Sequence, residues 1–205
     1  MQIYKRYRIG KFTTSNIELT DLLKAWIAVS VAFALVLGGF SNEFFPSLLI
    51  SLIVVGTGFL LHELGHKIVA QKYNYFAEFR SFDEMLLLAV IMSFFGFVFA
   101  APGAVMIGSK TIREDHNGRI SLAGPLINIF LALLFLIIFY TTHGFVNTIA
   151  NYGLRINSWL CLFNLIPVWQ FDGAKIWRWN KLAWSGMAGI GLLLLTQALW
   201  LPNLI

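Results

Sequence analysis

Two histidines and a glutamate stand close together in the pattern His62-Glu63-Leu64-Gly65-His66. This is the H-E-x-x-H spacing, and on a helix side chains four positions apart share one face. Both imidazoles can therefore reach one zinc ion, and Glu63 can face a water bound to it. Zinc lowers the pKa of such a water to about 7, and a neighbouring carboxylate can take its proton. The motif predicts His62 and His66 as zinc ligands and Glu63 as the general base.

A catalytic zinc site needs a third protein ligand and an open fourth position. Most other acidic residues lie in expected loops, but Asp172 directly follows an apolar run. Pro167 interrupts that run, and Gly173 allows the chain to turn just after the carboxylate. Asp172 is therefore the candidate third ligand. The alternative is a carboxylate at a helix end, paired with Lys175.

The elements that must position these residues are membrane-spanning helices. Hydrophobic residues make up 58% of the 205 residues and charged residues 12%, whereas soluble domains have about 45–50% and about 25%. This composition argues against a water-soluble globule and a disordered chain. The net charge of +5 does not indicate a nucleic-acid binder, because the basic residues lie between apolar runs, as membrane topology requires. A structural role for intramembrane histidines remains the alternative to catalysis, although ionisable residues within a bilayer are costly and usually functional.

Six apolar segments approach or exceed the roughly 17–20 residues that a helix needs to cross the hydrocarbon core. They are Ala25–Phe40, Ser47–Leu61 continuing to Ala70, Met85–Ala101, Ile120–Tyr140, Ile149–Trp169 and Leu182–Leu201.

The distribution of Lys and Arg tests whether all six segments cross, because positive charge is retained on the cytoplasmic side. Six full crossings leave nine of the fifteen basic residues inside. If Met85–Ala101 instead dips in and returns through an extended strand at Pro102–Ser109, fourteen of fifteen lie inside, with Arg155 as the exception. Asp172 then also emerges on the same side as the histidines. The preferred topology has five crossings and one re-entrant hairpin.

The predicted fold is an all-α polytopic membrane protein with about five to six transmembrane helices and a re-entrant helix/β-strand segment. The whole chain, residues 1–205, is predicted to form one membrane-embedded domain. Its expected parts are a cytoplasmic tail (1–24), a first helix and loop (25–46), a catalytic core (47–177) and a last helix (178–205).

Three blocks of this sequence resemble the site-2 protease family of intramembrane zinc metalloproteases, peptidase family M50. The first is His62–His66, the second is Gly124-Pro125 followed by Asn128, and the third is Asn164–Pro167 followed by Asp172-Gly173. Their order and spacing agree with the family from about Ser47 to Trp177. Residues 168–171 depart from the proline-rich stretch and leucine found there in many relatives.

The resemblance implies His62, His66 and Asp172 as zinc ligands and Glu63 as the base. It also implies that Asn128 and Asn164 contact the substrate or steady the reacting carbonyl. For Asn128, an interhelical hydrogen bond, worth about 0.6 kcal/mol on average, is the alternative.

The sequence therefore predicts a zinc metalloendopeptidase, with one Zn²⁺ per chain, that cuts transmembrane or membrane-adjacent protein substrates within the lipid bilayer. An extended substrate is expected to pair with the strand at Pro102–Ser109. A prokaryotic cytoplasmic membrane, with the active site toward the cytoplasm and no nucleic-acid partner, is the expected setting. A membrane zinc hydrolase of another amide or of a lipidated peptide, and a non-catalytic metal-binding membrane protein, are the two alternatives. The sequence leaves the oligomeric state open.

Overall fold

The computed structural model describes residues 4–98, 102–109 and 111–201 of the chain. Within them the protein is mostly helical, and four helices are long and apolar enough to cross a membrane. They are α1 (Asn16–Gly38), α2 (Phe44–Lys72), α4 (Glu114–Thr141) and α7 (Lys181–Trp200). Contacts between residues divide the chain into two compact units, residues 1–63 with 67–110, and residues 64–66 with 111–205.

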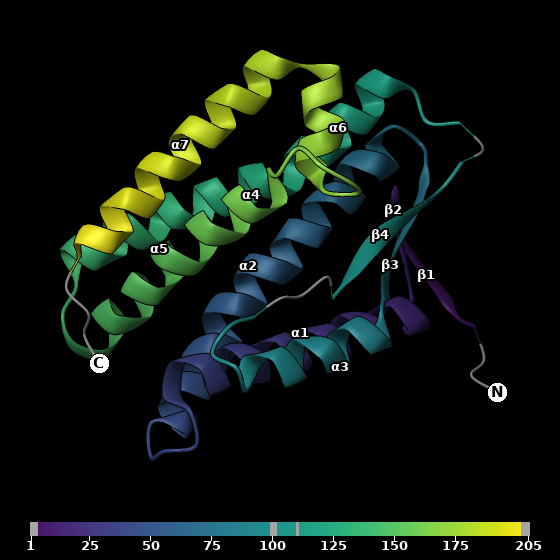
Figure 1. The fold of residues 1–205 in the computed structure, drawn as a ribbon. Helices are drawn as coiled ribbons and strands as arrows, with labels where there is room; N and C mark the ends of the chain where they lie inside the picture. Colours follow the sequence, from purple (N-terminus) through teal and green to yellow (C-terminus); the bar gives the residue numbers. More distant parts are fainter. Residues whose placement is uncertain (1–3, 99–101, 110, 202–205) are drawn as a thin grey trace. The chain divides into compact units, whose positions relative to one another are not determined.

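The first unit combines α1, most of α2 and the helix of residues 83–93 with two small antiparallel sheets of two strands each (Figure 1). Strands β1 (Arg6–Ile9) and β2 (Phe12–Ser15) pair antiparallel, and so do β3 (Phe76–Ser81) and β4 (Gly103–Gly108). The indole N–H of Trp26 on α1 donates to the Leu52 carbonyl on α2 at 3.0 Å. Helices α1 and α2 are thus joined by a side-chain hydrogen bond.

The start of the chain differs from the expected tail of residues 1–24. It contains the β1–β2 hairpin, and α1 begins at Asn16 rather than at Ala25. The Ser15 hydroxyl accepts a hydrogen bond from the Glu18 N–H at 3.2 Å, which caps the helix and satisfies one of its unpaired amides. The apolar run marked only the part of the helix suited to lipid, and the polar first turns precede it.

The strand expected at Pro102–Ser109 is confirmed as β4. The helix before it, α3 (Asp83–Ser93), has only 11 residues, so it is about 16 Å long and too short to cross a hydrocarbon core of about 30 Å. The end of the expected segment, residues 99–101, lies outside the described residues. Whether α3 and β4 form a re-entrant hairpin in a membrane stays a prediction.

The four candidate spans among the described helices are fewer than the five to six expected. Besides α3, the expected span that is not among these four is α5 (Gly144–Asn164), which is 21 residues long. Asn151, Arg155 and Asn157 interrupt its apolar sequence. Length alone therefore suits a crossing, but the polar composition of α5 separates it from the four apolar helices.

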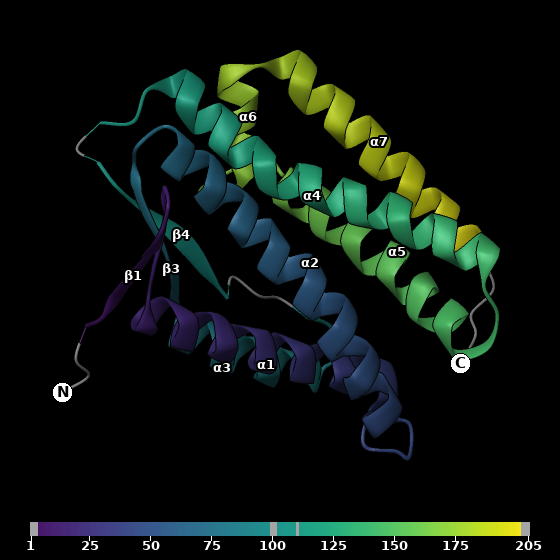
Figure 2. The same ribbon diagram turned by 180° about the vertical axis from the view of Figure 1, so that it is seen from behind.

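The second unit packs α4, α5, α6 (Asp172–Trp179) and α7 against one another, and Figure 2 shows the same helices from behind. Arg155 on α5 donates to the carbonyl of Leu201, directly after α7, at 2.9 Å. The Trp184 indole N–H on α7 donates to the Leu165 carbonyl at 2.7 Å. These bonds join the two ends of α7 to the middle of α5 and to the residue that follows α5.

Candidate metal centre

The histidines of the H-E-x-x-H motif lie on one continuous helix, as the sequence predicts. Helix α2 runs from Phe44 to Lys72, so His62 and His66 are separated by one turn. Both side chains are buried, with 5% and 7% of their surface exposed. Two imidazoles held at this spacing on a rigid helix can point toward one ion.

A backbone carbonyl holds the ring of His66. Its Nδ1 lies 2.7 Å from the carbonyl oxygen of Ile120 on α4. Since a carbonyl only accepts, Nδ1 must carry the hydrogen and donate it, which leaves Nε2 as the ring nitrogen available to a metal. Hydrogen bonds of this kind orient metal-binding histidines and set their tautomer.

Gly65 allows α4 to come this close to the histidine. A Cβ atom added at Gly65 would meet the Ala123 carbonyl oxygen at 3.2 Å and the Cδ1 of Ile127 at 2.5 Å. The glycine within the motif is therefore a point of close helix packing. It lets the Ile120 carbonyl reach the imidazole of His66.

Asp172 is the first residue of α6 and is also buried. Its Oδ2 lies 3.0 Å from Nε2 of His66, and its Oδ1 lies 3.7 Å from the Lys175 ammonium. The contacts are therefore compatible with both roles considered for Asp172, as a metal ligand beside His66 and as a carboxylate paired with Lys175. The lysine pair is the longer of the two contacts.

The position of Asp172 depends on Gly173. A Cβ at Gly173 would collide with the carbonyl group of Leu165 and come within 2.8 Å of the Ile166 carbonyl oxygen. The chain thus closes a loop between Leu165 and Gly173, with residues 166–172 between them. Trp169 in this loop has a left-handed backbone (φ 54°) and is 84% exposed.

The ligand atoms of His62, His66 and Asp172 all lie within 4.8 Å of one another, so these three residues could hold a metal ion. Two atoms that bind one tetrahedral zinc at about 2.0–2.2 Å are themselves about 3.3 Å apart. The 3.0 Å between His66 Nε2 and Asp172 Oδ2 is close to that value. With Nδ1 donating to Ile120, His66 Nε2 and Asp172 Oδ2 face each other as two acceptors, so this contact needs either a shared proton or a metal ion between them. The donor set therefore fits zinc.

Glu63 is buried on α2 directly after His62, with 9% of its surface exposed. Its role as a base stays a prediction from the motif.

The two asparagines expected to contact substrate are placed differently. Asn128 on α4 is fully buried, and its amide donates to Oδ1 of Asn157 on α5 at 3.0 Å. Asn164 is only partly buried, and its amide donates to the Leu160 carbonyl of its own helix at 2.9 Å. Asn157 was missed by sequence reasoning, although a polar residue within an apolar helix is a usable signal for a buried hydrogen bond.

The helices and the buried site together indicate a class of protein. Four of the described helices are long and apolar enough to cross a membrane, and two histidines of α2 meet Asp172 of α6 in a buried set that could bind a metal. Three such ligands with an adjacent glutamate are typical of the active site of a metallohydrolase.

Comparison with known proteins then gives the family. The chain is 38% identical over 188 residues to the "Putative zinc metalloprotease MJ0611" of Methanocaldococcus jannaschii, a match covering 89% of this chain and 96% of that protein. It is 31% identical over 176 residues to the "Zinc metalloprotease MJ0392" of the same organism, covering 83% of this chain but 44% of the relative. No family model and no solved structure match the chain. The protein belongs to the family of these zinc metalloproteases.

Proposed function

We propose that the protein is an intramembrane zinc endopeptidase of the site-2 protease type. The observation that carries the proposal is the convergence of His62, His66 and Asp172, whose ligand atoms lie within 4.8 Å of one another on helices of an apolar chain. The relatives named as zinc metalloproteases support a proteolytic use of such a site. One zinc ion per chain is the stoichiometry that three ligands and an open position imply.

The chemistry is hydrolysis of a peptide bond. A zinc ion held by His62, His66 and Asp172 would supply Lewis acidity and make a neighbouring water more acidic. Glu63 takes the proton from the attacking water as its oxygen bonds to the carbonyl carbon. Glu63 then delivers that proton to the amide nitrogen as the C–N bond breaks.

The substrate is proposed to be an extended segment of a transmembrane or membrane-adjacent protein. Strand β4 pairs with β3 along one edge, and in the part of the chain that the structure describes this sheet has only two strands. An extended peptide can add to the other edge of β4 through main-chain hydrogen bonds. Asn164 is proposed to add a side-chain contact; for Asn128, the same role requires it to exchange its bond with Asn157.

The site is proposed to open to the cytoplasmic side of a prokaryotic cell membrane. The support is the distribution of basic residues, because fourteen of the fifteen Lys and Arg side chains fall on one side in the re-entrant topology. That side also receives the end of α2 that carries the histidines.

Purified protein in lipid nanodiscs, tested against a panel of single-span substrates, tests the proposal. Glu63→Gln keeps the size of the side chain but removes its basicity, so cleavage should slow by at least about a hundred-fold while zinc is retained. Near-normal cleavage by this variant would contradict the role of Glu63. Cleavage of a lipidated peptide or small amide, with no cut in any protein substrate, favours the rival hydrolase. Bound zinc with no hydrolysis at all favours a non-catalytic protein.

A further inference from the structure

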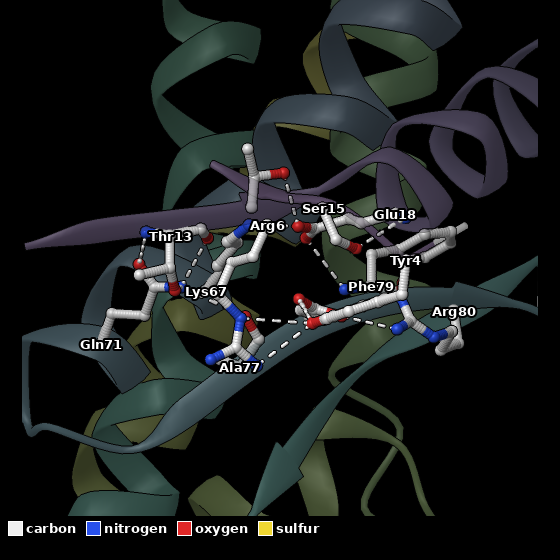
Figure 3. A network of polar contacts seen from close by, with 12 residues as sticks. Tyr4, Arg6, Thr13, Ser15, Glu18, Lys67, Gln71, Ala77, Phe79 and Arg80 are labelled. Atoms are coloured by element: carbon white, nitrogen blue, oxygen red, sulfur yellow. Dashed lines mark hydrogen bonds and ion pairs between the residues drawn. The ribbon is translucent and has the colours of Figure 1, made fainter. Parts of the chain in front are cut away.

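A carboxylate outside the metal centre joins three segments of the first unit. Glu18 lies in the first turn of α1, and its side chain is fully buried. Its Oε2 accepts a hydrogen bond from the Thr14 hydroxyl at 2.7 Å and one from the Lys67 ammonium, and its Oε1 accepts one from the Phe79 N–H at 2.9 Å. Figure 3 shows these bonds converging on Glu18 from α2 and β3.

The partner of Glu18 directly follows the motif histidine along α2. Lys67 is 3% exposed, and its ammonium also lies 4.5 Å from the centre of the Phe12 ring. Burying two charges is costly, and apolar residues of similar volume often stabilise a fold equally well. Stability alone is therefore a weak reason to place this ion pair here.

One turn further along α2, Gln71 makes a second connection of the same kind. Its side-chain oxygen accepts from the Thr13 N–H at 3.1 Å, and its amide nitrogen donates to the carbonyls of Thr13 and Ala77 at 2.9 and 3.1 Å. Gln71 therefore occupies the main-chain hydrogen-bonding positions between β2 and β3 (Figure 3). The last turns of α2 are bonded to both two-stranded sheets.

These contacts extend to the strand proposed to bind substrate. Ala77 faces Ile107 and Phe79 faces Val105 in the β3–β4 register. Holding the backbone of β3 at Ala77 and Phe79 therefore holds β4 as well, at a fixed offset from α2. Glu63 belongs to the same unit and the same helix.

We propose that Glu18 and Lys67 are positioning residues, which set the offset between the substrate-binding strand β4 and the helix that carries Glu63. The inference rests on the proposed peptidase function. A substrate strand bound to β4 presents its scissile bond correctly only when this offset is kept. Misplacing reacting groups by about 1 Å can lower a rate by about a hundred-fold.

The test compares Glu18→Gln, Lys67→Met and the double variant that carries both changes. Each single variant leaves one buried polar group without its charged partner, so it should lose stability, and kcat/KM should fall by roughly tenfold or more with zinc retained. The double variant removes both charges and should recover thermal stability. Its kcat/KM should stay low, because the connection between α1, α2 and β3 is still missing.

A second readout does not depend on activity. Hydrogen exchange of the β3 amides should be faster in Glu18→Gln and in the double variant than in the wild type, because a neutral acceptor binds the Phe79 N–H more weakly than a carboxylate does. The matched control is Lys24→Met/Asp83→Asn, which removes an ion pair of 2.8 Å between α1 and the start of α3 in the same unit. Its side chains are 42% and 70% exposed, and both readouts should stay within about twofold of wild type.

Recovery of kcat/KM together with stability in the double variant would overturn the positioning role, and so would unchanged exchange of the β3 amides in Glu18→Gln. An equal loss of kcat/KM in the Lys24→Met/Asp83→Asn control would do the same. A wild-type protein that binds zinc but cleaves no peptide contradicts the proposed function instead, and the exchange measurement then still decides whether Glu18 fixes β3.

Discussion

His66 and Lys67 are consecutive residues of α2, and each is buried against a carboxylate. His66 faces Asp172 with an acceptor nitrogen, because its other nitrogen donates to the Ile120 carbonyl. Lys67 faces Glu18 with a full complement of donors. The His66–Asp172 contact is favourable only when a proton or a metal ion lies between its two acceptor atoms. In the Lys67–Glu18 pair, the ammonium already donates a hydrogen bond to the carboxylate. We therefore propose different roles for these two similar pairs, metal binding for His66 with Asp172 and the positioning of β3 and β4 for Lys67 with Glu18.

The largest expected difference is in the zinc content of variants at His66 and Lys67. His66→Ala removes one of three proposed ligands, so bound zinc and cleavage should both fall to background. Lys67→Met leaves the ligand set intact, so zinc content should remain near wild type even where cleavage is reduced. Metal analysis of the two purified variants makes the comparison. Equal zinc loss in both would mean that the two centres are not separate.

Close packing at Gly65 is the next most sensitive feature of the metal centre. Gly65→Leu places atoms against the Ala123 carbonyl and Ile127, and overpacking of this kind costs about 1–3 kcal/mol. Displacing Ile120 from His66 should also weaken zinc binding by about 10–100-fold. Gly186→Leu on α7 is the control, because a Cβ there meets nothing within 4 Å. Zinc titration and thermal unfolding of both variants check this; normal zinc affinity in Gly65→Leu would contradict it.

The residues that come together as a candidate metal site, His62, His66 and Asp172, were proposed from the sequence because each carries a local signal; that they bind a metal stays a prediction. His62, Glu63 and His66 are set by helix periodicity, and Asp172 was found as the acid that ends an apolar run. Strand β4 was likewise indicated by a Pro-Gly break and β-branched residues. Glu18 gave no such signal, since a glutamate in the first turn of a helix is ordinarily a solvated residue that favours the helix dipole. Its partners, Lys67 and Phe79, are 49 and 61 positions away, and only the folded chain brings them together.

Variants of the buried Asn128–Asn157 pair test whether Asn128 belongs to the substrate-binding site. Asn128→Ala and Asn157→Ala each break the same 3.0 Å hydrogen bond, so each should lower the free energy of unfolding by a similar amount, about 0.6 kcal/mol on average for such bonds. Their effects on cleavage should also be similar. A large loss of cleavage in Asn128→Ala alone would show that Asn128 contacts the substrate.

The smallest expected effect concerns the exposed ion pair between Lys24 and Asp83. The Lys24 ammonium, hydrogen-bonded to the carboxylate, holds the pKa of Asp83 below its ordinary value. A lowered pKa in the folded state gives stability that is present above the ordinary pKa and is lost as the pH falls through the lowered one. Asp83→Asn should therefore match the wild type in thermal stability at acid pH and fall slightly below it at neutral pH. A gap that widens toward acid pH would contradict the assignment.

Zinc stoichiometry of Asp172→Ala, measured beside the wild type and Glu63→Gln, tests the central assignment most directly. Asp172 is the one proposed ligand outside the H-E-x-x-H motif, and its place in the set depends on its 3.0 Å approach to His66. We predict one zinc per chain in the wild type and in Glu63→Gln, and a clear loss of zinc in Asp172→Ala. Full zinc content together with full cleavage in Asp172→Ala would show that another residue completes the site.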